Sequence, residues 1–127
     1  MQPVQRIHGA ILIQQEFCVI QFGIFNPPIF RKRSLKCLFR AGVPIAVASH
    51  GGDLYREMDA LAAAGIPALD VLVAATRNGA IALHQLDQRG TIQAGKSADL
   101  IVLPKNPGED TRNLRGGRVM QSGEWVR

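Results

Sequence analysis

Residues 42–54 read GVPIAVASHGGDL, and this stretch decides the fold class. Its apolar run, residues 43–48, is continuous and bounded by turn residues. Such a run is typical of a strand that is buried on both faces, as in a parallel sheet. Residues 49–52 then form a loop at the carboxyl end of the strand, and Asp53 can cap the next helix by accepting a hydrogen bond from a free amide of its first turn. The stretch predicts the strand, loop and helix of an α/β protein.

Helical periodicity follows this stretch. The spacing of apolar residues predicts two helices, over roughly 54–64 and 67–77. Gly65 suits the end of the first helix, and Pro67 suits the first turn of the second, where its missing donor costs nothing. The pair Asn78-Gly79 is expected to break the second helix, before a short piece through residues 80–83. The apolar stripe of the first helix consists of Leu54, Met58, Leu61 and Ala62.

Beyond the helices, the pattern changes to short runs rich in β-branched residues that alternate with turn residues. This pattern predicts two β-hairpins, one centred near Gly95 and one near Ser122. The order of elements is therefore a strand, two helices and a small β unit. The four runs are residues 90–92, 100–103, 118–120 and 125–126.

The first 34 residues differ in character, since short apolar runs alternate there with glutamine. Residues 19–25 favour a strand by residue type, and the proline pair 27–28 would stop any ladder because proline has no amide donor. A short helix is expected to start near Leu35 and to stop at Gly42. We divide the chain into residues 1–34, 35–87 and 88–127.

Composition limits the classes of partner. The 127 residues carry a formal charge of +5, and five of the cations lie close together in residues 31–40. A nucleic-acid reader should also carry a recognition helix or stacking aromatics at useful spacing, and the sequence has neither. We therefore interpret the basic cluster as a solvated face and expect no nucleic-acid partner.

The two cysteines, Cys18 and Cys37, have no CxxC spacing and make no disulfide framework. Free thiols in a reducing compartment are the default, so we expect a cytoplasmic protein. The apolar residues 9–25 are interrupted by Gln14, Gln15, Glu16 and Gln21, which would be costly in hydrocarbon. No membrane association and no secretory signal are predicted.

Three stretches resemble, in order, the C-terminal region of the amidohydrolase superfamily. They are residues 42–54, AATRNGAIAL at 74–83 and GTIQAGKSADLIVL at 90–103. The tail from residue 106 adds a match that points to the imidazolonepropionase and prolidase-like subgroup. The resemblance covers about residues 35–127. It implies an α/β fold, namely a C-terminal fragment of a (β/α)8 barrel followed by part of a small β-sandwich.

The same resemblance implies a mechanism for the family. One or two divalent metals, usually zinc, lower the pKa of a bound water so that hydroxide attacks a C–N bond. An aspartate at the end of the last strand takes the proton of that water. In this sequence His50 occupies the aspartate position, and it is the candidate catalytic residue and the candidate metal ligand.

The sequence supplies little else for a metal. It has no His-x-His pair, and catalytic zinc needs about three protein ligands. We expect His84 to lie at the exposed end of a helix and His8 to be incidental. Asp53 could offer a nearby carboxylate, but its position suits a helix cap better. Zinc or another divalent metal is therefore implied by the family but is not expected to bind to this chain alone, and the substrate-binding residues stay unknown.

Two functions remain open at this point. The first is an amidohydrolase-related hydrolase that uses metal-activated water on an amide, cyclic amide or dipeptide, with a small-molecule substrate, and that is incomplete or inactive as this chain. The alternative is a non-catalytic remnant or a module that packs against another chain. The resemblance places further strands beside both β units. We therefore expect open edges that favour self-association, or a missing N-terminal portion that would cover them, unless residues 1–34 take the place of the absent strands.

Overall fold

The computed structural model of the chain describes residues 11–14, 17–21, 28–48 and 53–126. Its first sheet has the order β1-β2-β3, from β1 (Ile11–Gln14), β2 (Phe17–Gln21) and β3 (Ile45–Ala48). β1 is antiparallel to β2, whereas β2 and β3 are parallel and pair Cys18 with Ile45. The consecutive residues Ile45 and Ala46 are 5% and 2% exposed. The prediction of a parallel strand buried on both faces is confirmed for β3.

The helix between these two parallel strands starts earlier than we expected. α1 spans Pro28–Arg40, so the helix expected from Leu35 is confirmed but begins at the second proline of the pair. Proline favours the first helical position because its fixed φ suits the helix and its missing donor is not needed there. Gly42, at φ +75°, follows the helix end. The residues before position 35 thus give β3 a parallel neighbour.

Three helices follow β3, and the predicted pair is confirmed except for its breakpoint. They are α2 (Leu54–Ala63), α3 (Ala68–Ala75) and α4 (Arg77–Ala82). The break lies at Thr76, so the prediction of a break at Asn78-Gly79 is wrong. Thr76 Oγ1 donates to the carbonyl of Leu72 at 2.7 Å, a contact one turn back that bends helices. Asn78 and Gly79 lie inside α4.

The core lies where these helices meet β3. Leu61 of α2 and Val71 of α3 are 1% and 0% exposed. Burial of such side chains contributes about 1.5–3 kcal/mol each to folding. The buried apolar cluster consists of Leu35, Ile45, Met58, Leu61, Ala64, Ile66, Val71, Ala74 and Leu114.

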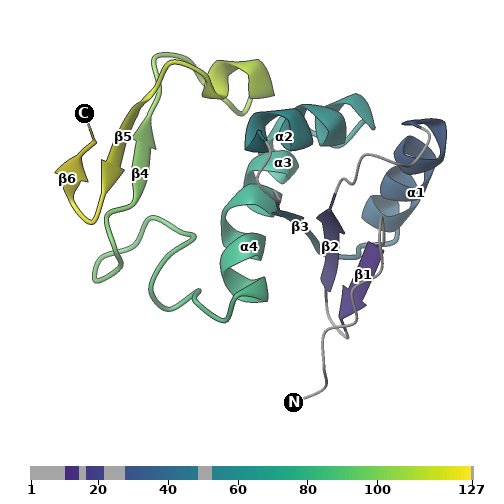
Figure 1. Cartoon of the computed structure of the whole chain (residues 1–127), viewed down its shortest axis with the longest axis horizontal. Coiled ribbons are helices and arrows are strands. Elements are labelled where there is room, and N and C mark those ends of the chain that lie inside the picture. The colour runs from purple at the N-terminus through teal and green to yellow at the C-terminus, as the bar shows by residue number, and fades with distance from the viewer. Residues whose placement is uncertain (1–10, 15–16, 22–27, 49–52, 127) are drawn as a thin grey trace.

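The second sheet is antiparallel, with the order β4-β5-β6. Its strands are β4 (Leu100–Val102), β5 (Arg118–Gln121) and β6 (Glu124–Trp125), and the short helix η1 (Thr111–Leu114) lies between β4 and β5. The hairpin at Ser122 is confirmed. Ser122 and Gly123 both have positive φ, as hairpin turns of two residues require. Figure 1 shows helices α2–α4 between the two sheets.

The predicted hairpin near Gly95 is wrong. β4 pairs with β5, with Leu100 opposite Met120, and residues 90–92 are not a strand. Lys96 holds this loop together, because its ammonium donates to the carbonyl of Leu86 and to Thr91 Oγ1.

No helix in the described part of the chain is long and apolar enough to cross a membrane.

Candidate functional site

The carboxyl end of β3 is the place where the sequence predicts chemistry. β2 and β3 are parallel, so their carboxyl ends lie at one edge of the sheet, and α/β proteins bind ligands at such an edge. The loop of residues 49–52, with His50, lies outside the described residues, so its role stays a prediction. Asp53 is confirmed as the cap of α2, because its Oδ1 accepts from the amide of Tyr55 at 2.9 Å.

A hollow of about 180 Å³ lies at the opposite end of the same strand. Val43, Pro44 and Ile45 line it from the strand side, and Asp70 and Asn78 line it from the helices. Conserved chemistry in barrel enzymes is placed at the carboxyl ends of strands, whereas the amino ends serve stability. The hollow therefore lies away from the end of β3 at which the sequence predicts chemistry.

Asn78 fixes β3 against α4. Its Nδ2 donates to the carbonyl of Ile45 at 2.8 Å, across 33 residues of sequence. A buried carbonyl without a donor costs about 1–3 kcal/mol, so this contact stabilises the edge of the strand. The sequence pattern suggested that Asn78 ends a helix, but its amide instead sets the position of the strand that leads to His50.

The backbone of His84 helps to end helix α4. Its side chain belongs to no group of potential metal ligands in the described part of the chain. His84 follows α4 with φ +55° and is exposed. Its amide donates to the carbonyl of Ile81, and the amide of Gln85 donates to Ala80. These are the two bonds of a Schellman helix end, in which the residue with positive φ is usually glycine. The prediction that His84 lies at the exposed end of a helix is confirmed, whereas His8 lies outside the described residues.

We expect His84→Gly to stabilise the chain by about 1 kcal/mol, because glycine carries no Cβ penalty at positive φ. Urea unfolding followed by circular dichroism measures the change. His84→Ala is the matched control, since alanine keeps the Cβ and should give no such gain. Equal stabilisation by both substitutions would show that loss of the imidazole, and not relief of the backbone, is responsible.

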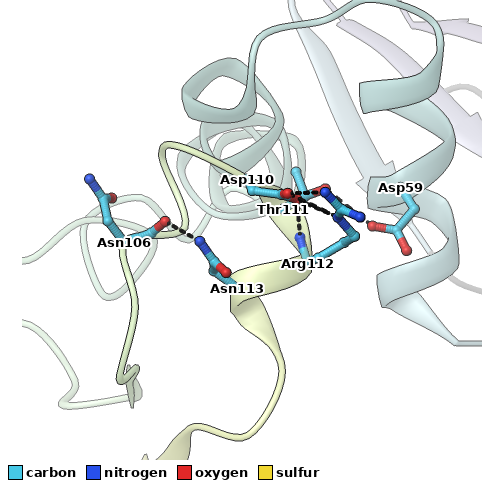
Figure 2. Close-up of polar contacts among 6 residues, drawn as sticks. All are labelled: Asp59, Asn106, Asp110, Thr111, Arg112 and Asn113. Atoms are coloured by element: carbon cyan, nitrogen blue, oxygen red, sulfur yellow. Dashed lines mark hydrogen bonds and ion pairs between the residues drawn. The ribbon is translucent and has the colours of Figure 1, made fainter.

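A polar cluster joins α2 to η1 (Figure 2). Asp59 of α2 accepts from Thr111 Oγ1 at 3.1 Å, and its other oxygen accepts from Arg115 Nη2 at 2.7 Å. Arg115 also lies over the ring of Tyr55, 5.4 Å from the ring centroid. Thr111 is 5% exposed, so its hydroxyl needs this acceptor.

Asp110 lies beside this cluster and caps η1. Its carboxylate accepts from the amide of Arg112 at 2.8 Å and from the guanidinium of the same residue. These contacts lower the pKa of Asp110 from 3.8 to about 2, first through the side-chain hydrogen bond of Arg112. Sequence reasoning missed the cluster. An aspartate before a short helix is a visible cap signal, but 56 residues separate Asp59 from Arg115 and no local pattern links them.

The described residues do not fit the metal centre that the family resemblance implies. Within residues 11–14, 17–21, 28–48 and 53–126, no three side chains of His, Cys, Asp or Glu gather in a way that could hold a metal ion. A catalytic zinc takes about three protein ligands in fixed geometry. Asp53 and Asp59, two acids near the start and middle of α2, instead accept hydrogen bonds from amide, hydroxyl and guanidinium groups.

Comparison with known proteins gives a consistent picture. Residues 33–126 match the model of the amidohydrolase family. The 5-methylthioadenosine/S-adenosylhomocysteine deaminase of Moorella thermoacetica is 38% identical over 125 residues, which covers 80% of this chain and 29% of the deaminase. A solved Xaa-Pro dipeptidase with methionine in its active site has a TM-score of 0.68 at 28% identity, over 76% of this chain and 25% of that chain.

A second solved structure, a prolidase complexed with N-methylphosphonate-L-proline, has a TM-score of 0.67 at 29% identity. The similarity covers 76% of this chain and 26% of the prolidase. This chain therefore spans little more than a quarter of the length of the proteins that it matches. The family match over residues 33–126 includes helices α2–α4 around β3 and the second sheet.

Proposed function

Because the chain belongs to the amidohydrolase family, we propose that it corresponds to the C-terminal part of a hydrolase that acts on carbon–nitrogen bonds. The match over residues 33–126 carries this proposal. The named relatives act on different compounds, yet a dipeptidase cleaves an amide bond and a deaminase removes an amino group. Hydrolysis of a C–N bond is the reaction that they have in common.

Within this proposal, residues 35–87 form the end of a (β/α)8 barrel and residues 88–127 form part of a small β-sandwich. The parallel pairing of β3 and the helices packed against it support the first assignment. The separate antiparallel sheet β4-β5-β6 supports the second. Residues 1–34 lie outside the family resemblance, although β2 supplies the neighbour of β3.

We propose His50 as the residue of this chain that reaches the chemistry. It follows β3 by two residues, at the place where the resembled family has an aspartate. A neutral imidazole can bind a divalent metal, but it cannot take up a proton as an anionic carboxylate does. Among the described residues, no three potential ligands gather in a way that could hold a metal ion. The remaining parts of the centre have to come from elsewhere than the described residues.

A chimera tests this assignment. The last quarter of the Xaa-Pro dipeptidase is replaced by residues 33–126 of this chain, and hydrolysis of a Xaa-Pro dipeptide is measured. We expect a folded, weakly active chimera in which His50→Asp raises turnover at least about tenfold, because a carboxylate restores the proton acceptor. His84→Asp is the control and should change nothing. A folded chimera that responds equally to both substitutions would exclude His50 from the site.

The second candidate function is a module that packs against another chain, and one observation favours it. The cross-strand neighbours Ile101 of β4 and Val119 of β5 are 49% and 42% exposed, and Trp125 of β6 is 44% exposed. A three-stranded sheet with uncovered apolar residues tends to associate. Sedimentation of the purified chain tests this. Oligomers are expected, and a monomer with a cooperative melt would count against it.

A further inference from the structure

Acidic side chains are the main metal ligands left in the described chain, and most of them already have a structural partner. Asp53 caps α2 through the amide of Tyr55. Asp59 uses one oxygen for Thr111 and the other for Arg115. Both oxygens of Asp59 are thus engaged by donors. A metal could replace these donors only by breaking the contacts of α2.

The acids of the C-terminal part are engaged in the same way. Asp99 accepts from the amide of Ser122 at 2.8 Å, in the turn between β5 and β6, and lies 3.6 Å from Arg89 Nη1. Asp110 is held by Arg112. These carboxylates therefore join segments that are distant in sequence or begin a helix. They do not converge on a common point where a cation could sit.

The cysteine and histidine side chains of the described residues do not converge on a common point either. Cys37 is exposed on α1, and His84 is exposed just after the end of α4. Among the described residues, no group of three potential ligands forms. A metal stabilises a fold when several ligands converge on it in the folded state and not in the unfolded chain, because its binding free energy then becomes folding free energy.

Asp59 stabilises the fold more than an exposed ion pair alone would. The Asp59–Arg115 pair is about two-fifths exposed on each side, and such pairs are worth little alone. Thr111, however, is 5% exposed and donates to the same carboxylate. Loss of the acceptor would leave a buried hydroxyl without its partner and would release η1 from α2.

We infer that the described part of this chain takes its fold without a metal ion, and that its carboxylates, Asp59 above all, instead join segments distant in sequence, α2 and the connection between β4 and β5 first among them. This inference goes beyond the proposed function, because it concerns the stability of the chain and not its reaction. Asp59 lies on α2 within the part assigned to the barrel end. Thr111 and Arg115 belong to the connection between β4 and β5.

Thermal melts of the full chain test the inference, with EDTA, with no addition and with excess zinc chloride. We expect the three melting temperatures to agree within about 1 °C, because a ligand stabilises only a state that binds it. A rise of several degrees with zinc, or a loss with EDTA, would overturn the inference. Zinc retained at one ion per chain after dialysis would do the same.

Two variants of Asp59 and one control variant test the proposed role of the Asp59 carboxylate. Asp59→Ala should lower the melting temperature by several degrees, even though alanine is the better helix former. Asp87→Ala is the control, because Asp87 is exposed and makes no hydrogen bond or ion pair with the described residues. Asp59→Asn keeps an acceptor for Thr111 and should fall between them. Equal melting temperatures for the Asp59→Ala and Asp87→Ala chains would refute the role of Asp59.

Discussion

Gly90→Ala is expected to destabilise the chain by about 2–4 kcal/mol, through backbone strain and overpacking together. Gly90 has φ +91°, and a Cβ built on it would lie 2.4 Å from Cβ of Ala80 and 3.2 Å from the carbonyl oxygen of Thr76. Thr76 lies at the break between α3 and α4, and Ala80 lies within α4, so neither can move without disturbing the helices. The measurement is the free energy of unfolding in urea.

Gly95→Ala is the control that separates the two causes. Gly95 has nearly the same φ, +88°, but no atom lies within 4 Å of a Cβ built there. Its substitution should cost only the strain of a left-handed residue, about 1 kcal/mol. If the two variants lost equal stability, the contacts of the added Cβ at position 90 with Ala80 and Thr76 would contribute nothing to the loss.

Leu61→Ala is expected to cost about 2–5 kcal/mol, the usual range for truncation of a buried leucine. Leu61 is 1% exposed and lies at the centre of the apolar cluster between α2 and β3. Because the total stability of a small domain is only about 5–15 kcal/mol, this variant should be close to unfolding. Leu83→Ala is the control, since Leu83 is 68% exposed. Comparable losses in the two variants would contradict the assignment of the core.

Local sequence patterns were sufficient to predict the elements that depend only on neighbouring residues. The apolar run before Ala48 predicted β3, Asp53 predicted the start of α2, and Ser122 predicted the turn between β5 and β6. Each of these features depends on residues within a few positions of one another. The propensity of those residues is therefore visible in the sequence alone.

The errors involve a strand partner that is distant in sequence and side chains that bond to nearby backbone. The strand at Leu100 pairs with Met120, beyond η1, rather than with the run at residue 92. Lys96 closes the loop by contacts with Leu86 and Thr91 that no periodicity encodes. The break at Thr76 depends on a single hydroxyl.

The same reasoning explains how much of the site could be predicted. The position of His50 after a buried strand, together with the family resemblance, marked the carboxyl end of β3. Asn78, which fixes that strand, and Asp59, which joins α2 to η1, act over 33 and 52 residues and were not identified. Side chains that act through tertiary contacts leave no local signal, unlike turn or cap residues.

Turnover by the purified chain, in buffer supplemented with zinc, tests the central claim most directly. The claim is that this chain contributes the scaffold of a C–N hydrolase and one candidate residue, but no complete catalytic centre. A Xaa-Pro dipeptide and 5-methylthioadenosine are suitable substrates, since named relatives act on such compounds. We predict no zinc-dependent hydrolysis, and none after His50→Asp. Measurable hydrolysis that is lost on His50→Ala would contradict the claim.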